Sequence, residues 1–241
     1  MEVGAGGLKA RLEQIHGRIG AALKRAGREP VTPDGGPAVR LVAVTKTHPP
    51  EVIQEALDAG VGAIGENRVQ EAARKFPGLR GPFEAHLVGH LQSNKAAAAV
   101  GLFDWVHSVD SLPLAQRLSR LCEERDKTLT ALWEVNTSGE PAKFGFEAEA
   151  LEREAAVMSL LPHLRFVGLM TLGPVPESGR DPRPCFRALR ALRDHLQFQL
   201  GHALPELSMG MSGDFETGVE EGATLVRVGT ALFGERARQG G

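Results

Sequence analysis

The sequence predicts an α/β protein, a single (β/α)8 barrel of the TIM type with one extra helix at its N-terminus. From about residue 40 onward, short apolar segments alternate strictly with helical patterns, as parallel strands joined by right-handed crossovers do. Eight such units within about 200 residues fit a closed barrel better than an open sheet. A dinucleotide-binding open sheet is further disfavoured because no G-x-G-x-x-G motif follows the first strand.

The segment before the barrel is predicted to be an amphipathic helix over residues 7–26 that packs outside the main fold. Its apolar residues recur at intervals of three and four, at Leu8, Leu12, Ile15, Ile19 and Leu23. Gly27 and Pro30 end this helix. Residues 31–37 then form a turn-rich connector, after which the regular alternation begins.

The barrel strands and helices are read from apolar runs and from helical periodicity. Strands are expected to start near Leu41, Gly62, Ala85, Phe103, Thr130, Arg165, Glu206 and Thr224. Helices are expected over residues 52–59, 69–76, 93–100, 112–124, 151–161, 186–200 and 215–221. Residues 173–185 hold four prolines and are expected to form a mobile loop on the functional face of the barrel.

The composition is that of an ordinary globular protein, with 241 residues, 42% of them hydrophobic and 24% charged. We expect one domain over residues 1–241, with the helix and connector in 1–38 and the barrel in 39–236. The formal charge of -2 and the lack of a basic block argue against nucleic acid as a partner. Cys122 and Cys185 have no CxxC spacing, so we expect them to be reduced core residues.

The N-terminal segment lacks the apolar stretch of a signal peptide, and no run reaches the roughly 18 apolar residues of a membrane span. We therefore expect a cytoplasmic protein that does not bind membranes.

The first strand, LVAVTK, ends in a lysine. If residues 41–46 are a strand, Val42, Val44 and Lys46 lie on one side of it, because side chains alternate with period two. Two interpretations follow. Lys46 is either a strand-end lysine that reaches water along its own methylene groups, or a reactive amine that forms a Schiff base with an aldehyde.

The segments after strands seven and eight read SMGMSGD and VGTALFG, in the place where barrels of this type bind phosphate. Glycines there let the backbone approach an anion, and Ser208, Ser212 and Thr230 supply hydroxyl groups. The alternative is that these residues only form turns and caps. A phosphate site facing Lys46 across the mouth of the barrel suggests a phosphorylated aldehyde as ligand.

Arg227 lies inside the apolar run TLVRVG, where its charge requires a partner. It either pairs with a carboxylate at the edge of the barrel, such as Glu66, or donates to a ring nitrogen of a cofactor. His86 and His90 do not form a zinc motif, because a glycine lies between them in an expected strand and no cysteine joins them. No metal site is predicted.

Several blocks of the chain resemble one known family. They are AVTKTHP, GENRVQEAARK, HLVGHLQSNK, VNTSGEPAKFGF, GLMTL and the long segment from LSMGMSGD to GTALFGER. In this order they resemble the pyridoxal 5′-phosphate (PLP) homeostasis proteins of the YggS/PROSC type. Two residues depart from the family pattern, since Arg68 stands where a tyrosine is usual and Ala85 where a tryptophan is usual.

The resemblance implies a single barrel like the N-terminal domain of alanine racemase (PLP fold type III), with PLP held on Lys46 as an internal aldimine. It further implies that the serine and backbone after strand seven and the Gly-Thr pair after strand eight hold the phosphate, and that an arginine faces the pyridine nitrogen. The implied cofactor-binding residues are Lys46, Asn67, Ser208, Met209, Arg227, Gly229 and Thr230.

Two functions of different class fit this resemblance: a PLP-dependent enzyme, such as an amino-acid racemase, and a protein that binds and delivers PLP. A racemase of similar fold uses a tyrosine from a second domain, whereas this chain has no tyrosine and no second domain is expected after Gly234. We therefore predict a non-catalytic PLP homeostasis protein, with a weakly active PLP enzyme as the alternative. The expected partners are PLP and apo PLP-dependent enzymes, and the chain is expected to be a monomer or weak homodimer.

Overall fold

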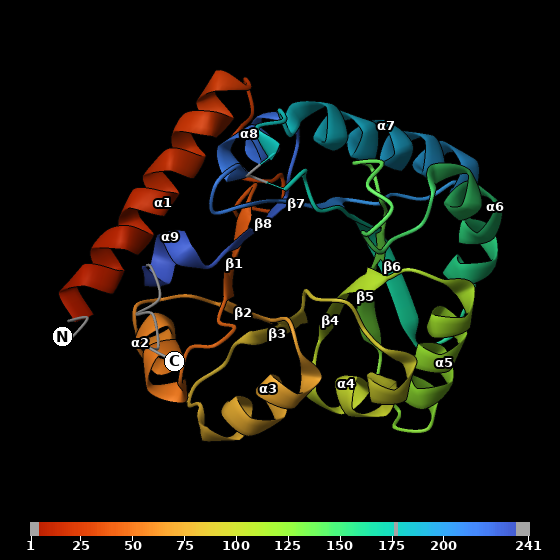
Figure 1. Ribbon diagram of the computed structural model, residues 1–241, viewed down its shortest axis with the longest axis horizontal. Helices are drawn as coiled ribbons and strands as arrows, with labels where there is room; N and C mark the ends of the chain where they lie inside the picture. Colours follow the sequence, from red (N-terminus) through yellow and green to blue (C-terminus); the bar gives the residue numbers. More distant parts are fainter. Residues whose placement is uncertain (1–4, 176–177, 235–241) are drawn as a thin grey trace.

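The eight predicted strands form a closed parallel barrel with helices around it (Figure 1). A computed structural model describes residues 5–175 and 178–234. Each strand pairs with the next one along the chain, and β8 closes the barrel on β1 through the pairs Arg40 with Leu225 and Ala43 with Val228. The predicted barrel is therefore confirmed.

The bounds of the elements lie close to those expected from periodicity. The strands are β1 (Arg40–Val44), β2 (Ala63–Glu66), β3 (Glu84–Leu87), β4 (Trp105–Val109), β5 (Leu129–Glu134), β6 (Leu164–Met170), β7 (Glu206–Met211) and β8 (Leu225–Val228). The α-helices are α1 (Ala5–Arg25), α2 (Pro50–Asp58), α3 (Val69–Lys75), α4 (Ala96–Leu102), α5 (Leu112–Glu123), α6 (Ala148–Ser159), α7 (Arg183–Leu200), α8 (Phe215–Glu220) and α9 (Thr230–Phe233). Short 3-10 helices cover Phe76–Gly78 and Ser93–Lys95.

Two local features differ from the prediction. The helix expected over residues 93–100 begins with a 3-10 turn and continues as α4 to Leu102. Helix α9 was not predicted, because a four-residue helix is too short to show apolar periodicity. In the proline-rich segment 173–185, the described residues precede and begin α7, and residues 176–177 lie outside the described part.

The strands bury two different faces. On β1, Ala43 packs into the large core between the strands and the helices. Val42 and Val44 instead belong to a separate cluster with Trp105, Leu132 and other inward-facing residues, which fills part of the barrel interior. This alternation is the period-two pattern that the sequence predicted for the first strand.

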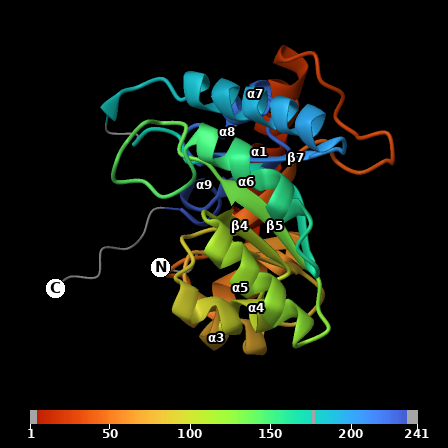
Figure 2. The same ribbon diagram turned by 90° about the vertical axis from the view of Figure 1, so that its right-hand side faces the viewer.

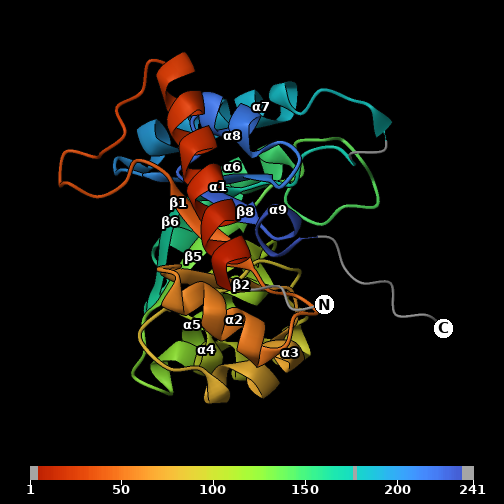
Figure 3. The same cartoon turned by 90° about the vertical axis from the view of Figure 1, so that its left-hand side faces the viewer.

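Helix α1 lies along the outside of the barrel, beside α8 and α9 (Figure 3). Its apolar residues, among them Leu8 and Ile15, are almost fully buried. On its polar side, Arg18 pairs with Glu216 and Arg25 with Glu220, both from α8. The predicted helix therefore packs on the outside of the barrel. No helix in the described part of the chain is both long and apolar enough to span a membrane.

Gly168 is expected to be essential for packing β6 against β7. It pairs with Glu206, and a Cβ atom at this position would lie 1.8 Å from the Glu206 carbonyl oxygen. Gly168→Ala should lower the free energy of unfolding by more than about 3 kcal/mol, because neither backbone can move without breaking the ladder. Chemical denaturation of the purified variants measures this change.

Gly20→Ala serves as the control for that substitution. Gly20 is exposed inside α1, and a Cβ atom there would meet no other atom within 4 Å. Alanine should stabilise the chain by about 0.5–1 kcal/mol because it favours the helix. A Gly168→Ala variant as stable as Gly20→Ala would contradict the packing described here.

Candidate functional site

A cavity of about 630 Å³ lies at the carboxyl ends of the strands. Two loops form one wall of it, one between β5 and α6 and one between β6 and α7; both project on the same side of the molecule in Figure 2. Lys143 from the first loop donates to the Gly173 carbonyl of the second at 2.6 Å, and Arg180 donates to the Ser138 carbonyl. Five of the predicted binding residues line the cavity: Lys46, Asn67, Arg227, Gly229 and Thr230.

Lys46 follows β1 directly, and the backbone on both sides of it is held in place. The Thr45 amide donates to the Gly65 carbonyl of β2, and the Thr47 amide donates to Glu71 of α3 at 3.0 Å. Thr47 also has a positive φ of 67°, which is unusual for a threonine and turns the chain sharply after Lys46. The lysine side chain therefore enters the cavity from a fixed point, next to Val44.

A buried ion pair supports this turn from the helix side of the barrel. Lys75 of α3 donates to Glu66 at 2.8 Å and to the Thr45 carbonyl at 3.0 Å, and the Thr45 hydroxyl also donates to Glu66. Burial raises the pKa of Glu66 despite these bonds. Glu66 therefore pairs with Lys75 on the outer side of the barrel wall. The suggested ion pair between Glu66 and Arg227 is wrong.

Arg227 is buried in the barrel interior, with 3% of its surface exposed. Its Nη1 atom donates to the Ser208 hydroxyl at 2.5 Å and its Nη2 atom to the Thr171 carbonyl at 2.8 Å. Burial lowers the pKa of Arg227 to about 10, so the guanidinium still carries its charge at neutral pH. Because Arg227 lines the cavity, it presents a permanent donor to a bound molecule.

A series of hydrogen bonds between buried side chains in the barrel interior supports Arg227. Ser208 Oγ lies 2.9 Å from His107 Nδ1, and His107 Nε2 lies 2.9 Å from His86 Nδ1. Burial lowers the pKa of His107 well below its usual value and also lowers the pKa of His86, so both rings are neutral. Since Arg227 can only donate, Ser208 Oγ accepts a hydrogen bond from it and donates one to His107 Nδ1. His107 Nε2 in turn donates to His86 Nδ1.

Ser208 and Met209, predicted to contact the phosphate, do not line the cavity. Both are fully buried within β7: Ser208 points into the barrel below the cavity, and Met209 belongs to the core between strands and helices. Strand β7 continues to Met211, so the first serine beyond the strand is Ser212. Met211 and Ser212, two and three residues beyond Met209, line the cavity.

Ser212 lies beside the start of α9, where backbone amides gather. The backbone amides of Gly229 and Ala231 both point at its hydroxyl oxygen, at 3.2 and 3.3 Å. Thr230, between them, is exposed at the cavity. Two amides and two hydroxyls thus gather at one end of the cavity, as phosphate oxygens require.

Asn67 reaches the cavity from the end of β2. Its backbone is packed tightly against Gly89, where a Cβ atom would lie 2.4 Å from the Asn67 carbonyl oxygen. A side chain at residue 89 would therefore push the end of β3 away from Asn67. Gly89, between His86 and His90, therefore allows this close contact. The two histidines point to different places: His86 turns into the barrel toward His107, and His90 faces the cavity.

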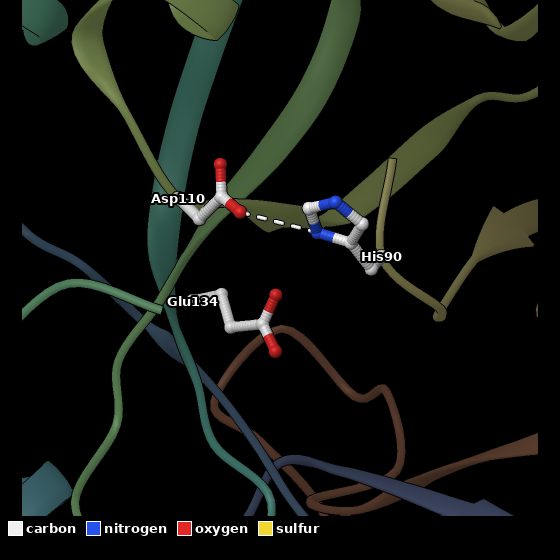
Figure 4. Close-up of side chains that lie close together, drawn as sticks. All are labelled: His90, Asp110 and Glu134. Atoms are coloured by element: carbon white, nitrogen blue, oxygen red, sulfur yellow. Dashed lines mark ion pairs between the residues drawn. The ribbon is translucent and has the colours of Figure 1, made fainter. Parts of the chain in front are cut away.

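Three side chains lie close together at the ends of β3, β4 and β5: His90, Asp110 and Glu134 (Figure 4). Of these, His90 and Glu134 line the cavity. His90 Nδ1 lies 3.2 Å from Asp110 Oδ2. Glu134 is only 4% exposed, and its Oε2 atom has no hydrogen-bond partner. Burial and the nearby Asp110 raise the pKa of Glu134 to about 7, although Arg227 opposes this effect. The group has donor atoms suited to a cation.

Sequence reasoning considered His90 only as a zinc ligand and did not identify Glu134. The signal was present in LTALWE, because Thr130, Leu132 and Glu134 alternate on the inward face of β5 and a glutamate at the last of these positions faces the mouth.

The chain is similar to known proteins over most of its length. The family model described as "Alanine racemase, N-terminal domain" matches residues 34–237. The "Pyridoxal phosphate homeostasis protein" of Aquifex aeolicus is 44% identical over 227 residues, covering 94% of this chain and 97% of that protein. The protein of the same name from Escherichia coli K12 is 37% identical over 238 residues, covering 93% and 95%.

The chain belongs to the pyridoxal phosphate homeostasis protein family. The resemblance seen in its sequence blocks is thereby confirmed. A solved member of related sequence, PipY of Synechococcus elongatus PCC7942 with PLP bound, is 38% identical with a TM-score of 0.79, covering 94% of this chain and 100% of that one. Alanine racemase of Clostridium difficile 630 shares the fold at 14% identity, with a TM-score of 0.69, and this chain covers 57% of its length.

Replacing Glu134 by glutamine is expected to change how stability depends on pH. The folded-state pKa of about 7 exceeds the usual value of 4.5, so the folded chain holds this proton more tightly than the unfolded chain. That contribution is complete below about pH 4.5 and is lost as the pH rises through 7. When the pH is raised from about 5 to about 8, wild type should lose about 1–3 kcal/mol of its free energy of unfolding relative to Glu134→Gln.

Urea denaturation at the two pH values measures this difference. Glu123→Gln is the matched control, because Glu123 is exposed on α5. Parallel pH profiles for wild type and Glu134→Gln would show that Glu134 titrates normally and would contradict the expectation.

Proposed function

We propose that this chain binds PLP in the cavity, through a Schiff base on Lys46, and takes part in PLP homeostasis. The observation that carries the proposal is that one cavity is lined by Lys46, by Ser212, Gly229 and Thr230, and by the Arg227 guanidinium. These are an amine, a phosphate site and a donor for a ring nitrogen, which together match the groups of PLP. The relative PipY, solved with PLP bound, supports the same ligand.

In this proposal each residue has a separate task. Ser212 and Thr230 with the amides of Gly229 and Ala231 hold the phosphate, and Lys46 supplies the amine that the PLP aldehyde joins. Arg227 donates to the ring nitrogen, while Ser208 and His107 keep the guanidinium in place. Asn67 lies where it can orient the ring substituents, since it lines the same cavity.

The residues favour a binding protein over an efficient racemase. A protonated Arg227 keeps the ring nitrogen unprotonated, which weakens the electron sink that carbanion chemistry needs. The chain has no tyrosine to act as the second base of a racemase. Glu134 is a titratable group in the cavity, and this observation favours a slow side reaction as the second candidate function.

We further propose that the chain acts as one domain in the cytoplasm, as a monomer or weak homodimer, and passes PLP to apo PLP-dependent enzymes. The family membership supports the delivery of cofactor, and its acceptors are expected to be proteins that require PLP on a lysine of their own.

Lys46→Ala should abolish the Schiff base with PLP. Lys46 is the lysine that follows β1 into the cavity, whereas Lys143 is bound to Glu140 and to the Gly173 carbonyl. Borohydride reduction followed by peptide mass mapping should place the pyridoxyl group on Lys46 in wild type and find it greatly reduced in the variant. Lys46→Arg keeps the charge without the reactive amine and is the control. A main adduct on Lys143 or Lys95 in wild type would refute the assignment.

Ser212→Ala and Thr230→Val should each weaken PLP binding by about tenfold, since a hydrogen bond to a charged phosphate contributes about 1.5 kcal/mol or more. Both variants should bind pyridoxal, which lacks the phosphate, as weakly as wild type does. Fluorescence titration of the purified proteins gives both affinities. Equal affinity of wild type for PLP and pyridoxal would remove the phosphate site from the proposal.

A further inference from the structure

The cavity carries an unusual distribution of charge. Lys46, Lys143 and Arg227 line it, and Glu134 is the one carboxylate among the described lining residues. The cationic groups suit an anionic ligand such as a phosphate. Glu134 has no partner for its Oε2 atom although 96% of its surface is buried (4% exposed), so the cavity leaves one strong acceptor unsatisfied.

Asp110 and His90 lie close to this acceptor and form a cluster with it. One donor atom from each of the three residues lies within 4.8 Å of the others (Figure 4). The proximity of Asp110 is one cause of the raised pKa of Glu134. A positively charged group placed between the two carboxylates would remove this repulsion and satisfy the free oxygen.

The spacing of the three side chains leaves room for an ammonium group. Ligands of a tetrahedral zinc ion lie about 2.1 Å from the metal, which places them about 3.4 Å apart. Acceptors around an ammonium group lie about 2.8 Å from nitrogen, and therefore about 4.6 Å apart. The three donor atoms lie within 4.8 Å of one another, which leaves room for an ammonium group among them, and the 3.2 Å contact of His90 Nδ1 with Asp110 Oδ2 orients that carboxylate.

We propose that Glu134, Asp110 and His90 receive the ammonium group of a primary amine that replaces Lys46 on the bound cofactor. This inference rests on the proposed function and names the class of molecule that unloads the site: an amino acid or a lysine side chain of an acceptor protein. Glu134 accepts one proton from the incoming ammonium group. The freed amine forms the new bond to the aldehyde carbon of the cofactor and passes a second proton to Lys46 Nζ. The bond from Lys46 Nζ to that carbon then breaks, and Lys46 leaves as a neutral amine that takes the first proton back from Glu134.

The test measures equilibrium binding to the chain without cofactor. Pyridoxamine 5′-phosphate carries a primary ammonium group on the aldehyde carbon, and 4-deoxypyridoxine 5′-phosphate has a methyl group there. Neither forms a Schiff base, so isothermal titration calorimetry reports the recognition of the amine alone. Wild type should bind pyridoxamine phosphate about tenfold more tightly than the deoxy compound, as expected for hydrogen bonds to a charged group.

Glu134→Gln and Asp110→Asn should each bring this ratio close to one and leave the affinity for the deoxy compound unchanged, which also shows that the variants are folded. The exposed control Glu123→Gln should keep the wild-type ratio. A wild-type ratio near one, or a ratio unaffected by both substitutions, overturns the inference. So does tight binding of Mn²⁺ that both substitutions abolish, because the cluster would then be a metal site.

Two further ligands distinguish the sources of the amine. The phosphopyridoxyl adducts of glycine and of the lysine side chain in a short peptide both carry a secondary ammonium group at the same position. Tighter binding of the glycine adduct identifies a free amino acid as the exchanging amine, and tighter binding of the peptide adduct identifies a protein lysine. Failure of the deoxy compound itself to bind wild type overturns the proposed function, and the inference with it.

Discussion

The buried guanidinium of Arg227 is the interaction on which the arrangement of this site depends. A charged group with only donor hydrogens cannot be buried inside a barrel without acceptors, and the chain supplies the Ser208 hydroxyl and the Thr171 carbonyl. Because the Ser208 hydroxyl accepts from Arg227, it donates to His107, and His107 donates to His86. These bonds orient both rings. Part of the interior below the cavity is therefore polar, and these hydrogen bonds hold Arg227 in one orientation.

The sequence predicted the architecture well because each unit of the barrel repeats the same local pattern. Apolar runs of five or six residues and helices with one apolar face are visible without tertiary information. Lys46 and Arg227 were recognisable for a related reason, since a charged residue at the end or in the middle of an apolar strand breaks the pattern. Gly229 and Thr230 were found from the position of their loop after the last strand.

The sequence was less informative where function depends on the position of a residue along the barrel axis. Ser208 and Ser212 lie four residues apart in SMGMS, and periodicity does not show that β7 runs on to Met211. Ser208 consequently holds Arg227 below the cavity, whereas Ser212 reaches it. The contact of Glu134 with Asp110 and His90 depends on strand stagger in the same way, because three separate strand ends have to reach one level.

The division of charge in the cavity bears on how a carrier can release its ligand. In the proposed function, phosphate contacts and Arg227 hold the cofactor firmly, and neither group is changed when the bond to Lys46 breaks. Release then requires a second amine at the aldehyde carbon, and such an amine arrives as a cation in a cavity already lined by Lys46, Lys143 and Arg227. In the inference above, the Glu134 carboxylate in the same cavity offsets this repulsion and accepts the proton that the amine has to lose. Because Arg227 leaves the ring nitrogen unprotonated, the same proton acceptor supports amine exchange without promoting carbanion chemistry.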